Sequence, residues 1–192
     1  MKRKLVVSSL IILALAFGGF GYKTIIAKNI APVVELSVFG QMNGYNATSF
    51  YRSFENAREQ GSKEVKIFMM SPGGVVVESF ALCDMINQAQ KDGMHITTVA
   101  YGMIASAAVP VFLCGDTRIA GPNTVFMLHK PDRAGIEDEN YIEMMDLDER
   151  LYIQLVADNC SLTYEQVDKL CTEYTWFTAK EAMQYGMIDR IE

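Results

Sequence analysis

Apolar and polar residues follow two different periods along the chain after residue 33. Short apolar runs typical of buried strands are separated by longer segments in which apolar residues recur at helical spacing. The predicted strands are 33–39, 65–70, 96–100, 117–120 and 124–129. The predicted helices are 46–60, 76–91, 105–114, 137–159, 163–171 and 179–185. Strands that alternate with helices in this way indicate an α/β domain with largely parallel strands.

Two of these helices have a clear apolar face. Helix 46–60 places Phe50, Phe54 and Ala57 on one side. In helix 76–91 the predicted buried face contains Phe80, Leu82, Met85, Ile86 and Ala89. We expect both faces to pack against the sheet.

The first residues of the chain have a different character. Three basic residues, Lys2 to Lys4, precede an apolar run over 5–20, and the first acidic residue is Glu35. This order is typical of a secretory signal peptide, although the run is also close to the length that spans a bilayer. We therefore expect 1–22 to be a signal peptide or an N-terminal membrane anchor, with 30–192 as an extracytoplasmic domain in the periplasm or at the cell surface. A buried core helix is the third interpretation.

Composition and charge exclude several classes of protein. Half of the residues are hydrophobic and 21% are charged, which excludes intrinsic disorder. A net charge of −6 argues against nucleic acid as a partner, because phosphate binding needs a basic face. The four cysteines form no C-x-x-C pair, so we expect no metal site. We expect no cofactor either. We interpret Cys83 and Cys114 as core residues, whereas Cys160 and Cys171 flank a predicted turn and helix and could pair in an oxidising compartment.

The residues with candidate chemistry follow three of the predicted strands. The turn 71–74 reads Ser-Pro-Gly-Gly, and its glycines permit a sharp turn with free N–H groups that can stabilise a negative charge. The segment 102–108 places Ser106 among small residues between a strand and a helix, and His129 ends another strand. Each motif alone is a weak signal. Together they indicate a nucleophile, a base and an oxyanion site, which hydrolytic catalysis requires in one place.

The order of these motifs resembles one known family. Ser-Pro-Gly-Gly, then Gly-Met-x-Ala-Ser-Ala-Ala, then Met-Leu-His-Lys-Pro is similar to the proteolytic subunit of the Clp protease, and so is the closing segment 176–189. The resemblance covers about 33–192. It implies a ClpP/crotonase-like spiral of ββα units, with the acidic helix after His129 as the C-terminal handle helix through which rings stack.

The resemblance also implies roles for individual residues. Ser106 would be the nucleophile, His129 the general base, and the N–H groups of Gly74 and Ala107 the oxyanion hole. The implied substrates are peptides or unfolded proteins, and the implied assembly is a homo-oligomeric ring. The apolar residues of 136–159 support that assembly, because a long helix with an apolar stripe needs something to cover it.

Two features depart from the family pattern. The family has its triad carboxylate two residues before the Phe of the closing segment, and this chain has Thr175 there. Glu173 would share the face of Thr175 if the segment were extended, which makes it a candidate substitute. At the N-terminus, an export or anchor segment stands where the family has loops that meet an ATPase. We do not expect an ATPase partner, since there is no ATP outside the cytoplasm.

Other classes of function stay open. A Ser/Lys peptidase of the signal-peptide-peptidase-A kind would need a lysine base, but Lys130 is adjacent to His129 and its side chain should point away if the strand continues. An acyl-CoA enzyme of the crotonase kind would use the glycine N–H groups without Ser106. The third alternative is a weak or inactive relative that acts as a scaffold or binding protein. The sequence favours a serine-type endopeptidase outside the cytoplasm, attached to the membrane if its leader is not cleaved.

Overall fold

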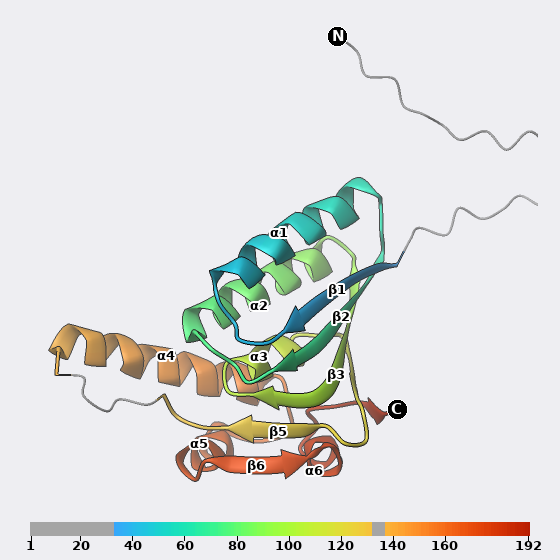
Figure 1. The fold of residues 1–192 in the computed structure, drawn as a ribbon. Helices are drawn as coiled ribbons and strands as arrows, with labels where there is room; N and C mark the ends of the chain where they lie inside the picture. Colours follow the sequence, from blue (N-terminus) through green and yellow to red (C-terminus); the bar gives the residue numbers. More distant parts are fainter. Residues whose placement is uncertain (1–32, 132–136) are drawn as a thin grey trace, which may run out of the picture. The chain divides into compact units, whose positions relative to one another are not determined.

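The computed structural model describes residues 33–131 and 137–192, in which seven strands form one sheet (Figure 1). The strands are β1 (Val34–Phe39), β2 (Glu64–Ser71), β3 (His95–Ala105), β4 (Thr117–Ala120), β5 (Val125–Leu128), β6 (Thr175–Thr178) and β7 (Arg190–Ile191). The helices are α1 (Gly44–Glu59), α2 (Val76–Lys91), α3 (Ala108–Leu113), α4 (Glu139–Asp158), α5 (Tyr164–Thr172) and α6 (Ala179–Gln184). The predicted alternation of strands and helices is confirmed.

The sheet is parallel except at one edge. Its main path runs β1-β2-β3-β4-β7, while β5 pairs with β3 and β6 pairs antiparallel with β5. The long strand β3 serves both branches, because Thr97–Ala100 pair with β4 and Met103–Ala105 pair with β5. Gly102 separates the two segments and has φ 64°, a left-handed conformation that glycine adopts without strain. The ends of β3 and β5 therefore lie beside each other.

The pairing of β3 with β5 also explains one error in the predicted elements. The strand predicted over 96–100 continues to Ala105, and the helix predicted over 105–114 is only Ala108–Leu113. Small residues at 105–107 fit either element, so only the partner strand decides between them. The short strands β6 and β7 were not predicted.

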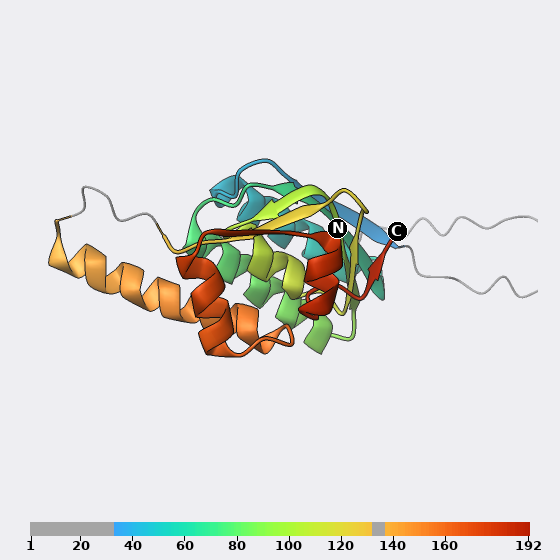
Figure 2. The same ribbon diagram turned by 90° about the horizontal axis from the view of Figure 1, so that it is seen from below.

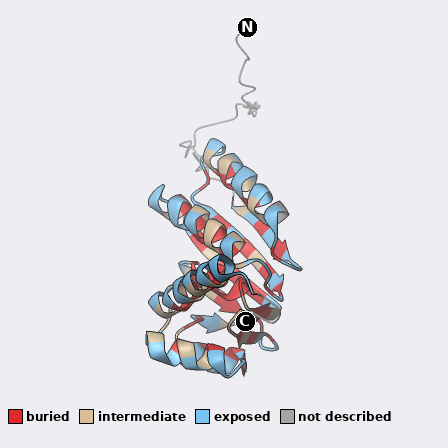
Figure 3. Ribbon diagram, turned by 90° about the vertical axis from the view of Figure 1, so that its left-hand side faces the viewer, coloured by how far each residue is buried: buried red, intermediate tan, exposed pale blue. Residues whose placement is uncertain are grey.

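The helices bury their predicted faces against the sheet. Phe50 and Phe54 of α1 are each 2% exposed, and all six residues of α3 are buried. In α2 the buried stripe is shifted slightly from the prediction, since Ser79 and Cys83 are buried while Phe80 and Met85 are only partly so. Figure 3 shows the buried residues along the sheet and on the inner faces of the helices.

The two halves of helix α4 differ in how they pack on the rest of the domain. Its C-terminal half packs on the body through Tyr152, Ile153 and Val156, and its N-terminal half projects beyond the sheet (Figure 2). Exposed apolar side chains, among them Leu147 and Leu151, remain on the part of 136–159 that the structure describes.

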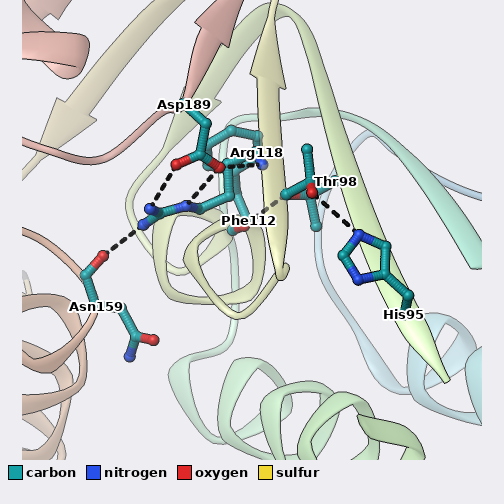
Figure 4. A network of polar contacts seen from close by, with 7 residues as sticks. His95, Thr98, Phe112, Arg118, Asn159 and Asp189 are labelled. Atoms are coloured by element: carbon teal, nitrogen blue, oxygen red, sulfur yellow. Dashed lines mark hydrogen bonds and ion pairs between the residues drawn. The ribbon is translucent and has the colours of Figure 1, made fainter. Parts of the chain in front are cut away.

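A polar network fixes the end of the chain to β4 (Figure 4). The Asp189 carboxylate accepts hydrogen bonds from the Arg118 backbone N–H at 2.7 Å and from its Nη2 at 3.0 Å. Nη1 of Arg118 donates to the Asn159 carbonyl oxygen, 2.7 Å away, just after α4. On the neighbouring strand His95 is exposed, and its Nε2 lies 3.0 Å from Thr117 Oγ1.

All four cysteines are free thiols. Cys83 and Cys114 are buried in the core, as predicted, and the structure does not pair Cys160 with Cys171. Burial raises the pKa of the Cys171 thiol to about 12, so it remains protonated at neutral pH.

The predicted leader, 1–22, lies outside the described residues. Among the helices at 33–131 and 137–192, none has the length and apolar character needed to cross a membrane.

Candidate active site

The side chains of Ser106 and His129 meet where β3 and β5 end. Their Oγ and Nε2 atoms are 2.7 Å apart, a hydrogen-bond distance. The backbone holds the two strand ends together as well, because the Ser106 N–H donates to the Met127 carbonyl oxygen at 2.9 Å. The convergence of these residues, expected from three separate motifs, is thus a consequence of parallel pairing between β3 and β5.

Ser106 has an unusual backbone conformation. Its φ is 54°, in the left-handed region, which costs a residue with a side chain roughly 1–2 kcal/mol. Part of the compensation comes from α4, where the buried Tyr152 hydroxyl donates to the Ser106 carbonyl oxygen at 3.2 Å. Burial raises the pKa of Tyr152, so the phenol remains a donor. A sharp strand-to-helix turn of this kind exposes a serine hydroxyl while the residues around it stay buried.

The glycine turn lies directly against the serine turn. Gly73 has φ 95°, and a Cβ there would lie 2.7 Å from Ser106 Cβ and 2.9 Å from the Ala107 nitrogen. A Cβ on Gly74 would collide with the Met42 carbonyl oxygen. Both positions therefore require glycine, for space as well as for conformation.

Two backbone N–H groups remain available at this junction. Within the described part of the chain, no protein acceptor is bonded to the N–H of Gly74 or of Ala107. These are the groups that the family resemblance implied as oxyanion donors. Free N–H groups beside a serine hydroxyl can stabilise an oxyanion that forms there.

The ring of His129 also contacts Tyr174. The two ring centroids are 4.6 Å apart with planes at 49°. Tyr174 has φ 57° and is the residue at which the chain turns from α5 into β6. Sequence reasoning missed both Tyr174 and Tyr152, because a tyrosine in an amphipathic pattern carries no signal that distinguishes a site contact from ordinary packing.

Thr175 and Glu173 lie close to His129 in the fold but are held differently. Thr175 pairs in register with Leu128, the residue before His129, and its hydroxyl donates to the Leu170 carbonyl oxygen at 2.9 Å. Glu173 ends α5 in a helical conformation and forms an exposed ion pair with Lys169 at 3.8 Å. The extended segment that would have placed Glu173 on the face of Thr175 is not present, so that premise is wrong.

Lys130 is unsuited to act as a base. Its Nζ lies 2.7 Å from an Asp168 oxygen and 2.8 Å from a Glu149 oxygen. Hydrogen bonds to these two carboxylates, first Asp168 and then Glu149, raise the lysine pKa well above its ordinary value. A general base must be unprotonated at working pH, so this geometry disfavours the Ser/Lys alternative.

The fold and the site together define a class of protein. A serine hydroxyl bonded to a histidine at adjacent strand ends, beside a glycine turn with available N–H groups, is the arrangement of a serine hydrolase. Among the described residues no group of three or more His, Cys, Asp or Glu side chains is placed to hold a metal ion.

Comparison with known proteins identifies the family. Residues 35–192 match the family model described as Clp protease, and the chain belongs to this family. The ATP-dependent Clp protease proteolytic subunit of Lactococcus lactis subsp. cremoris is 28% identical over 141 residues, 69% of each chain. The ATP-dependent Clp protease proteolytic subunit 2 of Thermobifida fusca is 31% identical over 141 residues, which are 69% of this chain and 67% of the relative.

Solved structures confirm the predicted fold class. ClpP1 from Listeria monocytogenes aligns with a TM-score of 0.71 at 26% identity, over 82% of this chain and 90% of its own. A mutant of the same Listeria protein aligns with a TM-score of 0.73 at 25% identity and the same coverage. The chain therefore has the ClpP-like α/β fold and is a serine peptidase homologue of the Clp family.

Proposed function

We propose that the domain is a serine peptidase in which Ser106 is the nucleophile and His129 the general base. The observation that carries this proposal is the 2.7 Å hydrogen bond between Ser106 Oγ and His129 Nε2. In the reaction Oγ attacks the scissile carbonyl carbon while Nε2 accepts the hydroxyl proton. The histidine then transfers that proton to the leaving amine, and water releases the acyl group by the same steps in reverse order.

The oxyanion that forms in this attack needs donors that are already in place. We propose the N–H groups of Gly74 and Ala107 for this role. The rigid glycine turn against Ser106 supports the proposal, since preorganised donors cost no reorganisation during the reaction.

Thr175 limits the expected rate. A hydroxyl can accept a hydrogen bond from an imidazole but cannot balance the charge of the imidazolium that forms during catalysis. Loss of the triad carboxylate lowers turnover by about 10⁴ in serine proteases. We therefore propose a slow peptidase, with Thr175 rather than Glu173 at the third triad position. Glu173→Gln should leave turnover unchanged, and loss of activity in this variant would restore Glu173 as the carboxylate.

The substrates that we propose are peptides or unfolded proteins, and no cofactor is required by this chemistry. Two relatives carry names that describe them as proteolytic subunits of an ATP-dependent protease. We propose no ATPase partner here, because residues 1–22 have the pattern of an export or anchor segment and would place the domain outside the cytoplasm. Two reporters fused after residue 40 test this location. A reporter that works only outside the cytoplasm should be active, and activity of a reporter that works only in the cytoplasm would contradict the location.

We also propose that α4 joins subunits into a ring. Leu147 and Leu151 lie one helical turn apart and are each about half exposed, which leaves an apolar surface without a cover in the single chain. Light scattering of the purified domain should show an oligomer, and the double variant Leu147→Lys, Leu151→Lys should dissociate it. A wild-type domain that is monomeric at micromolar concentration would contradict this assembly.

The activity is tested by labelling with a serine-directed fluorophosphonate. We expect covalent labelling of the wild type and none of Ser106→Ala, with strong loss in His129→Ala. Ser49→Ala, which removes an exposed serine of α1, is the matched control and should label normally. Absence of labelling in the wild type, or labelling that persists without Ser106, would favour the scaffold alternative.

A further inference from the structure

An apolar pocket of about 270 Å³ lies between the start of α2 and one face of α4. Val75 and Val77 form one side, and Met144 and Met145 form the other. Both valines are about half exposed, so the pocket is accessible in the single chain. Its walls suit an extended aliphatic side chain, because they offer apolar surface on two opposite sides.

Chain connectivity places this pocket beside the Ser/His pair. Val75 directly follows Gly74, one of the proposed oxyanion donors, and Pro131, which also lines the pocket, is two residues after His129. An acyl group whose carbonyl oxygen is bound by Gly74 therefore has its own side chain next to the pocket.

Helix α4 gives a second, independent link to the nucleophile. Asp148 lines the pocket, and Tyr152 lies four residues further along, on the same face of the helix. Because the Tyr152 hydroxyl is bonded to the Ser106 carbonyl oxygen, Asp148 lies about one helical turn, roughly 5.4 Å along the axis, from a residue that contacts the serine turn.

Asp148 is the charged residue of this largely apolar lining, which also includes Tyr141. Burial raises the pKa of its carboxyl group, and within the described ranges no cation or hydrogen-bond donor is bonded to it. Glu149, the next residue, has a different environment, since Lys130 Nζ lies 2.8 Å from its carboxylate. A partly desolvated carboxylate without a partner is unfavourable, and a cation that enters the pocket would relieve that cost.

We infer that this pocket binds a lysine or arginine side chain of the substrate, at the residue on the acyl side of the scissile bond. The aliphatic stem would lie between the valines and Met144, and the charged end would bind the Asp148 carboxylate. This inference rests on the proposed peptidase function and adds a substrate preference to it. A leucine or methionine side chain would fill the same space but would desolvate Asp148 further without pairing it.

The test compares two ligands that differ in a single charge. Two fluorescent tripeptide amides, one ending in Lys and the other in norleucine, are bound to the full-length Ser106→Ala chain and followed by fluorescence anisotropy. Norleucine has the aliphatic stem of lysine without the ammonium group. We expect the Lys peptide to bind at least about tenfold more tightly, as a charge-assisted hydrogen bond in a partly buried site would require.

Substitution of Asp148 identifies the source of the preference. Asp148→Asn should remove the difference between the two peptides, with weaker binding of the Lys peptide and equal or tighter binding of the norleucine peptide. The matched control is Asp158→Asn, which removes an exposed acid of the same helix that is bonded to Gln154 and should keep the preference. Equal binding of both peptides, or a preference that survives Asp148→Asn, would overturn the inference.

The outcome is separable from that of the peptidase proposal. Anisotropy with Ser106→Ala needs no catalysis, whereas fluorophosphonate labelling of the wild type needs no peptide side chain. Labelling without a Lys preference would reject the pocket assignment alone. A Lys preference without labelling would reject the peptidase and retain the pocket as a binding site for basic peptides.

Discussion

The hydrogen bond from Tyr152 to the Ser106 carbonyl oxygen connects helix α4 to the nucleophile, and Tyr152→Phe removes it with little change in volume. The hydroxyl is buried and lies 3.2 Å from its acceptor. Its removal leaves a buried carbonyl with one bond fewer, which costs about 1–2 kcal/mol. For a domain of this size each kcal/mol shifts the melting temperature by about 2–4 °C, so we expect a decrease of about 2–8 °C.

The same substitution should slow the reaction at Ser106. The left-handed conformation of this serine costs roughly 1–2 kcal/mol, and the Tyr152 bond helps to hold it. If most of the lost hydrogen-bond energy goes into relaxation of the serine turn, the left-handed conformation of Ser106 becomes about tenfold less populated. The factor follows because 1.4 kcal/mol corresponds to tenfold in an equilibrium constant.

Two measurements separate these effects. Thermal unfolding followed by circular dichroism reports stability, and the rate of fluorophosphonate labelling well below the melting temperature reports the serine turn. Tyr51→Phe is the control, because Tyr51 is an exposed tyrosine of α1 and its loss should affect neither quantity. A lower melting temperature with an unchanged labelling rate would show that Tyr152 contributes only packing. No change in either quantity would show that the hydrogen bond does not contribute.

Three further predictions concern the residues around the site and the chain end. Lys130→Met should reduce stability, because it leaves two carboxylates without their cation, but should retain fluorophosphonate labelling; loss of labelling with a normal fold would support a Ser/Lys mechanism. Thr175→Asp should raise peptide hydrolysis by at least tenfold, measured with a fluorogenic peptide, and no gain would exclude this residue from the third triad position. Partial burial raises the pKa of Asp189, but hydrogen bonds from Arg118 lower it more, so the folded value is below the usual 3.8. The stability that ionised Asp189 contributes should be complete above pH 3.8 and should disappear as the pH falls through the folded pKa. Urea unfolding midpoints measured between pH 6 and 2.5 should therefore fall more steeply for the wild type than for Asp189→Asn.

The regular elements were predictable from sequence because their apolar periods are strong. The bounds of α2 and β4 agree with the predicted 76–91 and 117–120, and β1 and α1 differ by one or two residues. Strand β7 has only two residues, too few to show a period, and β6 is a four-residue stretch between two helices, to which no element was assigned from the sequence. They are strands because β5 and β4 offer them an edge, which is information about distant parts of the chain.

The candidate site was partly predictable for a similar reason. Ser106 and His129 each follow an apolar run, and parallel strands bring such ends to one edge of a sheet, as their 2.7 Å contact shows. The contacts of Tyr152 and Tyr174 depend on the path of α4 and on a left-handed turn, neither of which has a local signature. The pairing of Lys130 with two helices likewise becomes visible only after folding.

The attachment of β7 has a consequence for the order in which the chain can fold. Ile191 pairs with Ala120 of β4, and the Glu192 N–H donates to the Ala120 carbonyl oxygen, so β7 covers the edge of β4 and completes one side of the sheet. Ser106, His129 and Tyr174 all precede β7 in the sequence. The site residues can therefore be in place before β7 has docked, and until it docks β4 has an open edge, which is a template for pairing with other chains. Docking of β7 closes this edge, so removal of 190–192 would lower folding yield before it affected catalysis.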